Sequence, residues 1–516
     1  MMKILMRMDG RGYKSYKLLL KERYKIGRIN LSFRKIQSDP FAPPSVLEIV
    51  TPNTLKGYPQ VALEDLLHRV LYKNLRKVSK KRGEGRSGEA SVPRPSNSIL
   101  KRSSVKVTDE NIAVRINVGL PSRRRRILAT EAIELIESVL KAFNSSLSDL
   151  KGSIEEHSKV YLVFNEIRNK LGRLKLVAFV GNGSILPRAC HYCEEPLKGA
   201  VPFESPTSMK VEIETKFGVF EGMGVPKGVT TVIGPAFHGK TTLLEALAKS
   251  IWPHVKGDGR ELVVTSKDFV YVRSEDGRVV KCVDVRSFIE LPNSDCFTTL
   301  DASGATSVAA SFQEAVEVGS NVIAIDEDYT ATNFLFLDPI IGKLYRTRTI
   351  RTLSEQLSSI KDKGISVLLI ANASSQVLVQ SDKVIYMENY SPEDLTERVK
   401  NEIDVNVNAI EYSKPSSRII EYVPPKKLKR RGLEIISPGW SAPLDFHTNP
   451  HIVEEAQVEF IAKFLSKKFS GKLSELDLPH PWDLCVTPNC SEVRTYEIAY
   501  ALNRCEGIRV MKLTNI

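Results

Sequence analysis

The chain has 516 residues, of which 42% are hydrophobic, and its net charge is +13. This length exceeds what one hydrophobic core usually holds and predicts two or three domains. No apolar run is long enough for a membrane-spanning helix, and the first residues lack the apolar stretch of a signal peptide, so we expect a soluble, cytoplasmic protein without membrane contacts.

Basic residues gather near the beginning of the chain. Residues 1–110 hold 24 Lys and Arg against 10 Asp and Glu. This asymmetry favours a polyanion, RNA or another nucleic acid, as a partner of the N-terminal part. A solvated charged surface is the plainer alternative and stays open.

The first 200 residues alternate basic stretches with helical and strand patterns. Tyr13, Tyr16 and Tyr24 stand among basic residues, where they could stack on bases, although core packing is the commoner role. A run rich in Gly, Ser, Pro and basic residues begins at Lys80-Lys81-Arg82 and predicts a loose loop or arm. A strand is expected at 105–118. The cluster Arg123–Arg126 is expected to open a helix at 127–143, which a helix at 154–171 and a strand at 174–180 follow.

From about residue 209 the order of strand, Gly-rich turn and helix predicts a parallel sheet with helices on its faces. Two helical patterns, at 451–468 and 493–505, follow in the tail. We therefore predict an α/β protein with a basic α+β N-terminal domain at 1–200, a nucleotide-binding core at 201–392 and a mainly helical C-terminal region at 393–516.

A phosphate-binding loop is the strongest motif. Gly234-Pro235-Ala236-Phe237-His238-Gly239-Lys240-Thr241 has the spacing GxxxxGK followed by Thr, between an apolar strand at 229–233 and a helix beginning with Thr242. Backbone N–H groups of such a loop bind phosphate. We expect ATP here, with Lys240 on the β- and γ-phosphates and Thr241 as a ligand of Mg²⁺.

A second strand, Asn321 to Ile325, carries acids at its carboxyl end. Asp326 is expected to hold Mg²⁺ through water, and Glu327 to act as the base for the attacking water. Asp328 follows without an assigned role. Before this strand, Asp301 to Ser307 forms a small-residue turn ahead of a helix, which predicts either an anion site or a plain N-cap by Ser303 or Thr306.

Several strings of residues, in one order along most of the chain, resemble the ABC-class predicted ATPases. They are Gln37-Ser38-Asp39-Pro40-Phe41-Ala42-Pro43-Pro44-Ser45, Gly183-Ser184-Ile185-Leu186-Pro187-Arg188, Gly222-Met223-Gly224-Val225-Pro226-Lys227-Gly228, the phosphate-binding loop, Asp301-Ala302-Ser303-Gly304-Ala305-Thr306-Ser307 and Asp326-Glu327-Asp328-Tyr329-Thr330-Ala331-Thr332-Asn333-Phe334. The resemblance implies an ABC-type nucleotide-binding fold and a head-to-tail homodimer. Ser303 and Gly304 would then contact the γ-phosphate in trans, and Ala331–Asn333 would lie at the dimer seam. Some members of the family are linked to RNA.

Two departures from the ABC pattern bear on turnover. No histidine follows the strand at 365–370, where a switch histidine is usual; Ser374 or Ser375 stands nearby, and Ser374 is our candidate for the role. No convincing Q-loop glutamine lies between Thr241 and Ser303. Hydrolysis is therefore expected to be slow.

The leading function is an ATPase coupled to binding of RNA, and the alternative is an ATP-dependent scaffold or switch with little turnover. A transporter subunit ranks low, because only 69 residues separate Gly234 from Ser303. A P-loop kinase is a further alternative. The CxxC at Cys190 and Cys193 is a weak zinc motif without a second pair, and the remaining cysteines are expected to be buried thiols.

Overall fold

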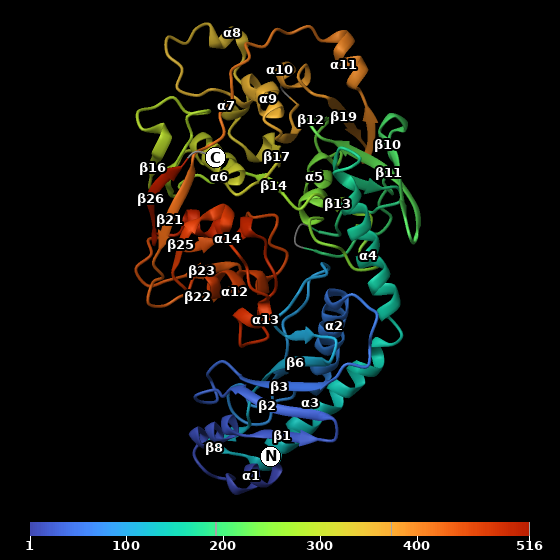
Figure 1. The fold of residues 1–516 in the computed structure, drawn as a ribbon, viewed down its shortest axis with the longest axis vertical. Coiled ribbons are helices and arrows are strands. Elements are labelled where there is room, and N and C mark those ends of the chain that lie inside the picture. The colour runs from blue at the N-terminus through green and yellow to red at the C-terminus, as the bar shows by residue number, and fades with distance from the viewer. Residues whose placement is uncertain (191–192, 373, 515–516) are drawn as a thin grey trace. The chain divides into compact units, whose positions relative to one another are not determined.

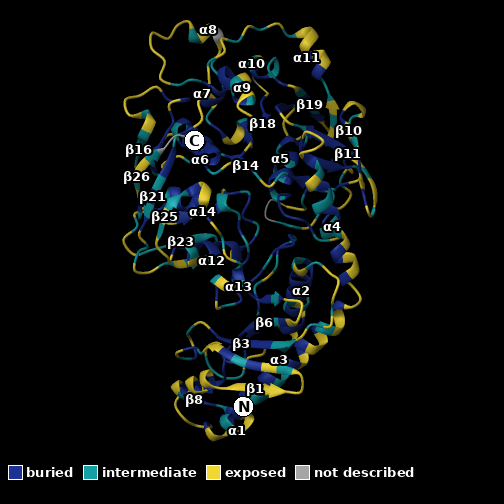
Figure 2. Ribbon diagram, in the orientation of Figure 1, coloured by how far each residue is buried: buried dark blue, intermediate teal, exposed yellow. Residues whose placement is uncertain are grey.

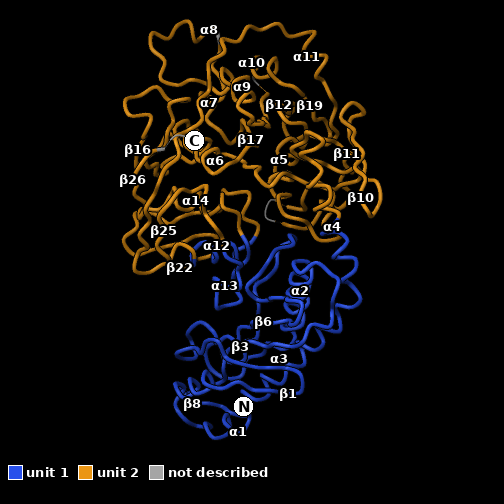
Figure 3. Tube along the Cα trace, in the orientation of Figure 1, with its two compact units in different colours: residues 1–162, 454–463, 479–492 blue, residues 163–453, 464–478, 493–516 orange. Residues whose placement is uncertain are grey.

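The computed structural model describes residues 1–190, 193–372 and 374–514. The chain forms two compact units (Figure 3). Unit 1 comprises 1–162, 454–463 and 479–492, and unit 2 comprises 163–453, 464–478 and 493–516. These interleaved units do not coincide with 1–200, 201–392 and 393–516, which stay a prediction of domain boundaries.

Unit 1 is built on a six-stranded antiparallel sheet of order β1-β2-β3-β6-β4, with β5 also paired to β6 (Figure 1). Helices α2 and α3 share one apolar core with this sheet, to which Leu67 and Val139 of the helices and Leu47 and Ile116 of the sheet belong. The expected strand at 105–118 is two strands, because a turn at 108–110 folds it into the β5–β6 hairpin. The elements of this unit are α1 Met2–Arg7, β1 Arg23–Ile26, β2 Ile29–Lys35, β3 Ser45–Pro52, α2 Gln60–Val78, β4 Ala90–Ser91, β5 Val105–Val107, β6 Asn111–Val118, β7 Ser122–Arg123, β8 Arg126–Ile127, α3 Ala129–Leu150, α13 Pro481–Leu484 and most of α12 Glu455–Phe464.

The three tyrosines near the beginning of the chain pack in this core. Tyr13, Tyr16 and Tyr24 are each buried. The hydroxyl of Tyr13 donates to the carbonyl of Leu120, and that of Tyr16 donates to the carbonyl of Pro121. Core packing, the commoner of the two roles weighed from the sequence, is therefore confirmed, and stacking on bases is not open to these side chains.

The basic run at 80–98 is not the loose arm that its composition predicts. Arg86 donates its backbone N–H to Pro40, and Gly88 donates to Gly119. Gly83 and Gly88 adopt positive φ, and a Cβ atom on either would collide with a backbone carbonyl oxygen. Gly83 and Gly88 therefore allow backbone segments to pack closely here, and amino-acid composition alone does not predict this packing.

The arginine cluster forms a hairpin tip and not the start of a helix. Strands β7 and β8 pair around Arg124 and Arg125, whose φ values are 51° and 58°, the pattern of a type I′ turn. The helix α3 begins only at Ala129. All four side chains from Arg123 to Arg126 are exposed.

Unit 2 contains the sheet that carries the phosphate-binding loop. Its order is β14-β17-β18-β12-β19-β20, and every pair is parallel except β19–β20 (Figure 1). The strands are β12 Val229–Ile233, β14 Phe269–Val272, β17 Val322–Asp326, β18 Ser366–Ile370, β19 Lys383–Glu388 and β20 Ser391–Asp394. The helices are α5 Lys240–Lys249, α6 Gly304–Glu317, α7 Thr332–Leu335, α8 Pro339–Gly342, α9 Leu353–Asp362, α10 Ser375–Leu378 and α11 Thr396–Glu402.

The inner strands of this sheet are mostly apolar and lie in the interior. Every residue of β17 and β18 is buried (Figure 2), as expected for a parallel sheet covered on both faces. The parallel strands predicted at 229–233, 321–325 and 365–370 are confirmed. A separate antiparallel sheet of order β10-β11-β9-β13 adjoins it in sequence, with β9 Leu176–Gly181, β10 Lys210–Thr215, β11 Gly218–Pro226 and β13 Val263–Thr265.

The region from residue 393 onward is mixed, whereas the sequence predicted a mainly helical one. The two predicted helices exist but are shorter, at α12 and α14 Thr495–Arg504. Short strands surround them in two three-stranded sheets, whose order is β25-β21-β26 and β22-β23-β24. Their bounds are β21 Ser417–Tyr422, β22 Lys429–Arg431, β23 Glu434–Ile436, β24 Leu444–Asp445, β25 Phe469–Lys472 and β26 Ile508–Thr514. Such short strands leave too little alternation to register in the sequence.

Six of the seven cysteines form disulfides, so the prediction of buried free thiols holds only for Cys505. Cys190 bonds Cys193, while His191 and Tyr192 between them lie outside the described residues. The other bonds join Cys282 to Cys296 and Cys485 to Cys490. Within the described residues, none of the helices has both the length and the apolar character to cross a membrane.

Candidate nucleotide-binding site

The phosphate-binding loop runs from the end of β12 into α5, at the carboxyl edge of the parallel sheet. Gly234 and Gly239 adopt φ values of 139° and 97°. Phe237 also has positive φ, 66°, and is 96% exposed. A bulky residue in this conformation is strained, and such strain is typical of functional loops.

The turn of the β19–β20 hairpin lies against this loop. A Cβ atom on Gly234 would come within 2.2 Å of the carbonyl oxygen of Met387, and one on Gly239 within 2.7 Å of the ring of Tyr390. The Nδ1 atom of His238 accepts a hydrogen bond from the backbone of Asn389 at 2.8 Å. The loop is therefore clamped, and both glycines are needed for close approach as well as for their φ values.

The side chain of Lys240 is folded over the loop. Its Nζ atom donates to the carbonyl oxygens of Gly234 and Pro235, at 2.7 Å each. The side chain is buried, so the ammonium is held at the mouth of the loop by these carbonyls. This places a cation beside the backbone N–H groups that the loop offers to phosphate.

Thr241 and Asp326 meet although 85 residues separate them. The Oγ1 atom of Thr241 donates to Oδ2 of Asp326 at 2.9 Å. Burial raises the pKa of Asp326 above its usual value, and the nearby Asp328 adds to this, while hydrogen bonds from Asp328 and Thr241 oppose it. A hydroxyl and a buried carboxylate at one point are a donor set that suits Mg²⁺, a cation that prefers oxygen ligands.

Glu327 follows Asp326 and points to the end of the neighbouring strand. Its Oε2 atom accepts a hydrogen bond from the backbone N–H of Asn372 at 2.7 Å. The Oδ1 atom of Asn372 in turn accepts from the backbone N–H of Gly234 at 3.1 Å. Asn372 is not among the site residues predicted from the sequence. The signal that identifies it is its place directly after β18, beside the phosphate-binding loop that follows β12.

Ser374, the candidate proposed from the sequence for this position, makes a different contact. Its Oγ atom accepts from the backbone N–H of Val377 at 3.4 Å and caps α10. The side chain is buried. Ala373, between the two, lies outside the described residues. The role assigned to Ser374 stays a prediction.

The small-residue turn caps α6. Ser303 is the N-cap residue and accepts from the backbone of Thr306, and Gly304 is the first residue of the helix. The N-cap reading of this turn is therefore correct, and it leaves the anion-site reading open, since Ser303 is exposed. No hydrogen bond among the described residues joins Ser303 or Gly304 to residues 234–242 of the same chain.

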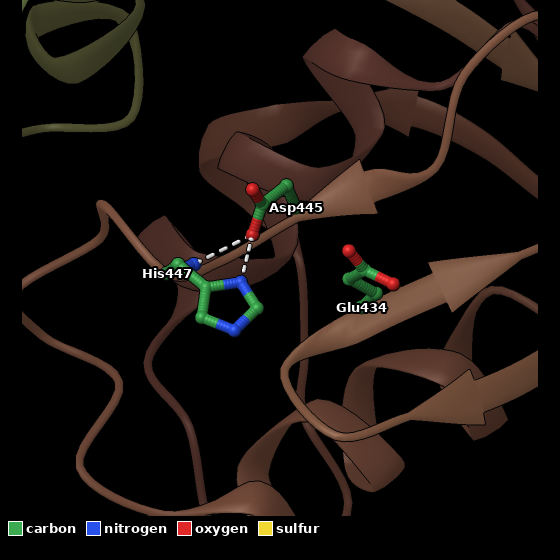
Figure 4. A group of neighbouring side chains, drawn as sticks. All are labelled: Glu434, Asp445 and His447. Atoms are coloured by element: carbon green, nitrogen blue, oxygen red, sulfur yellow. Dashed lines mark hydrogen bonds and ion pairs between the residues drawn. The ribbon is translucent and has the colours of Figure 1, made fainter.

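A second group of polar side chains lies away from this edge. Glu434 and Asp445 face each other across β23 and β24, and His447 donates from its backbone and shares a ring hydrogen bond with Asp445 (Figure 4). Their ligand atoms lie within 4.8 Å of one another. The cross-strand pairing and the Asp445–His447 hydrogen bonds account for this closeness, and we assign the group no function.

The chain was compared with known proteins. Residues 1–149 match a family model described as ATPase of the ABC class N-terminal, and residues 150–424 match the P-loop domain of the corresponding ABC ATPase model. An uncharacterized protein of Methanocaldococcus jannaschii is 29% identical over 278 residues, which is 49% of this chain and 61% of that protein. The chain therefore aligns with about three fifths of this relative's length.

Among solved structures, the ADP conformation of an ATP-binding cassette of an ABC transporter is similar at 14% identity. The match covers 44% of this chain and 94% of that cassette, with a TM-score of 0.28. A TM-score this low supports no residue-level comparison.

Proposed function

The chain belongs to the ABC-class ATPase family, and from this premise we propose that it binds Mg²⁺–ATP at the carboxyl edge of β12, β17 and β18 and hydrolyses it. The observation that carries the proposal is the meeting of Thr241 with Asp326 beside the clamped phosphate-binding loop. Two segments of the chain, the loop that ends in Thr241 and the strand that ends in Asp326, converge on that point, and each supplies a group that phosphate or Mg²⁺ requires.

In this proposal different groups of the chain bind the phosphates, hold Mg²⁺ and accept the proton of the attacking water. The backbone of Gly234 to Gly239 and Lys240 bind the phosphates, with Lys240 leaving its carbonyl partners for the β- and γ-phosphate oxygens. Thr241 and Asp326 hold Mg²⁺, which supplies charge neutralisation of the phosphates. Glu327, oriented by the N–H of Asn372, takes the proton from the attacking water.

Binding is tested by Lys240→Ala with Lys227→Ala as its control. Lys227 is an exposed lysine in the turn before β12, at the opposite end of that strand. Affinity for Mg²⁺–ATP is measured by isothermal titration calorimetry. Lys240→Ala should abolish binding and Lys227→Ala should leave it unchanged. Retained nanomolar-to-micromolar affinity in Lys240→Ala would contradict the proposal.

A switch or scaffold with little turnover is the second candidate. It is favoured by one observation: among the described residues, the contact to Glu327 at the end of β18 comes from the backbone N–H of Asn372, and no histidine lies there. A backbone N–H cannot exchange a proton as an imidazole does. Under this candidate ATP binding remains intact while phosphate release is negligible in both the wild type and Glu327→Gln.

We further propose that two copies close the site head to tail, with Ser303 and Gly304 of one copy on the γ-phosphate bound by the other. The exposed N-terminus of α6 supports this, since helix N-termini favour anions. Mixing Lys240→Ala chains with Ser303→Glu chains tests it. Each variant alone has no intact site, whereas random pairing restores about a quarter of the sites. A mixture that stays inactive would contradict shared sites.

A transporter subunit is disfavoured by the segment between α5 and α6. The structure describes residues 250–303 in full, and this segment contains short strands and a single 3-10 turn, Ser294–Cys296, but no α-helix. A helical subdomain that could dock membrane helices is therefore lacking between α5 and α6.

We also propose that ATP binding is coupled to RNA binding by unit 1. The hairpin tip at Arg123–Arg126 supports this, because four exposed guanidinium groups stand together on a pinned backbone. Arg125 accepts at its carbonyl from Tyr13, and its N–H donates to Glu84 at 2.5 Å. Arginines on a fixed turn suit phosphate groups of a nucleic-acid backbone.

A further inference from the structure

The end of β14 occupies the fourth position at the nucleotide-binding edge. β14 pairs in parallel with β17, and its last residue, Val272, lies opposite Ile325. The next residues along the two strands, Arg273 and Asp326, therefore lie at the same edge of the sheet, since the carboxyl ends of parallel strands coincide. The sequence offered no glutamine for this stretch, and the structure places an arginine here.

Arg273 lies among groups that belong to the phosphate-binding helix and the acidic strand. Its guanidinium lies 4.4 Å from the ring centre of Tyr271 and 4.5 Å from that of Tyr329, which is three residues beyond Asp326. Its terminal nitrogen is 3.3 Å from Oε1 of Glu245. Glu245 stands one helical turn after Thr241 on α5, so both side chains share one helix face.

These contacts position the guanidinium of Arg273 but leave part of its hydrogen-bonding capacity unused. The ion pair with Glu245 is long, and the buried Nε atom of Arg273 has no hydrogen-bond partner among the described residues. An arginine has five N–H donors in a fork that matches phosphate oxygens, so this one retains free donors beside the Mg²⁺ ligands.

We propose that the guanidinium of Arg273 binds the terminal phosphate group of ATP. This inference rests on the proposed function, since it requires ATP at this edge. In the strand order β14-β17-β18-β12, Arg273 follows the strand on one side of β17, which ends in Asp326, and Lys240 follows β12 on the other side. The two cations thus bracket the transferred phosphoryl group, where charge accumulates in the transition state.

The residues after Arg273 connect this contact to the rest of unit 2. Ser274 donates from its backbone to Tyr329, and its Oγ atom accepts from the backbone of Ala331, in the segment expected at the dimer seam. The backbone N–H of Glu275 donates to the hydroxyl oxygen of Ser307, and the carboxylate of Glu275 pairs with Arg504 of α14. A shift of Arg273 toward phosphate therefore moves a loop that contacts both α6 and α14.

The test compares affinities for Mg²⁺–ATP and Mg²⁺–ADP in a Glu327→Gln parent, which does not consume ATP. Arg273→Gln should weaken ATP binding by about tenfold or more, since a charge-assisted contact to the terminal phosphate is lost. ADP lacks that group, so its affinity should change by less than about twofold. Arg273→Lys keeps the charge but lacks the fork, and should fall between the parent and Arg273→Gln.

Arg398→Gln is the matched control, because Arg398 is an exposed arginine paired with Glu402 in α11. It should leave both affinities unchanged. Equal losses of ATP and ADP affinity in Arg273→Gln would show a structural role and overturn the inference, as would no loss. If Arg273→Gln does not fold, an Arg273→Lys chain with the parent's ATP-to-ADP ratio overturns it. A parent that binds neither nucleotide overturns the proposed function itself.

Discussion

The backbone N–H of Asn372 donates to Oε2 of Glu327 across 2.7 Å, while the side chain of the same asparagine accepts from Gly234. One residue thus joins the proposed base to the first glycine of the phosphate-binding loop. Because the parallel strands β12, β17 and β18 end at one edge, a residue after β18 is within reach of both neighbours. We therefore expect a movement of the loop on phosphate binding to reach Glu327 through Asn372.

Asn372→Ala and Ser374→Ala separate the two candidates for the switch position. Asn372→Ala removes the side-chain link to Gly234 and should slow single-turnover phosphate release by about tenfold, the worth of one hydrogen bond to a group in the site. Ser374→Ala should keep the rate and lower the free energy of unfolding by about 1 kcal/mol, because a helix N-cap is lost. The reverse result, a slow Ser374→Ala and an unaffected Asn372→Ala, would return the role to Ser374.

Asp326→Asn should increase stability in the absence of Mg²⁺ and abolish Mg²⁺-dependent binding. Burial raises the pKa of Asp326 in the folded chain, so its ionised form is destabilising at neutral pH and the neutral amide relieves this. The melting temperature measured without Mg²⁺ should therefore rise. A melting temperature that falls would contradict a penalised carboxylate.

The same shift predicts how binding depends on pH. A proton on Asp326 competes with Mg²⁺, and because the pKa is raised, this competition begins at a higher pH than for an ordinary aspartate. Affinity for Mg²⁺–ATP should therefore fall as the pH is lowered, beginning at a higher pH than an ordinary aspartate would give, measured by calorimetry with ADP without Mg²⁺ as the reference. An affinity that stays constant down to pH 4 would contradict Asp326 as a Mg²⁺ ligand.

The hairpin tip of unit 1 can lose charge without losing its turn. Arg124→Asn with Arg125→Gly supplies the residues that a type I′ turn prefers, so the fold should be kept. If both arginines contact phosphates, the slope of log K against log salt for single-stranded RNA should decrease by about 1.4. Lys426→Gln with Lys427→Gln, two exposed lysines of unit 2, is the control and should keep the slope. An unchanged slope in the hairpin variant would remove this tip from the interface.

The sequence predicted the parts of the site that repeat a local pattern. The strand before Gly234, the turn through Lys240 and the strand ending in Asp326 each combine apolar periodicity with a motif of fixed spacing, and the structure confirms these elements. Asn372 and Arg273 could not be predicted, because their importance comes from strand order, which brings together residues far apart in the chain. The positive φ values of Arg124 and Arg125 could not be predicted from the sequence either, since arginine seldom occupies that conformation.

The C-terminal region shows the limit for short elements. The strand pairing of β21 with β25 and β26 joins residues separated by dozens of positions. Strands β21 and β25 have six and four residues, and the pairing of β26 with β21 is interrupted by a shift in register. A buried ion pair between Arg418 and Glu317 ties β21 to α6. Neither the strand pairing nor the ion pair produces a periodic pattern of apolar residues in the sequence. The helices at 455–464 and 495–504 do produce one, and the prediction for this region was therefore mainly helical.

Single-turnover release of γ-phosphate, measured with the chain in excess over ATP, tests the central claim most directly. The wild type should release phosphate, and Glu327→Gln, whose amide cannot accept the proton, should do so at least about 10²-fold more slowly while binding ATP with unchanged affinity. Equal rates in the two chains would contradict Glu327 as the base, and with it the proposal that this edge of the sheet hydrolyses ATP.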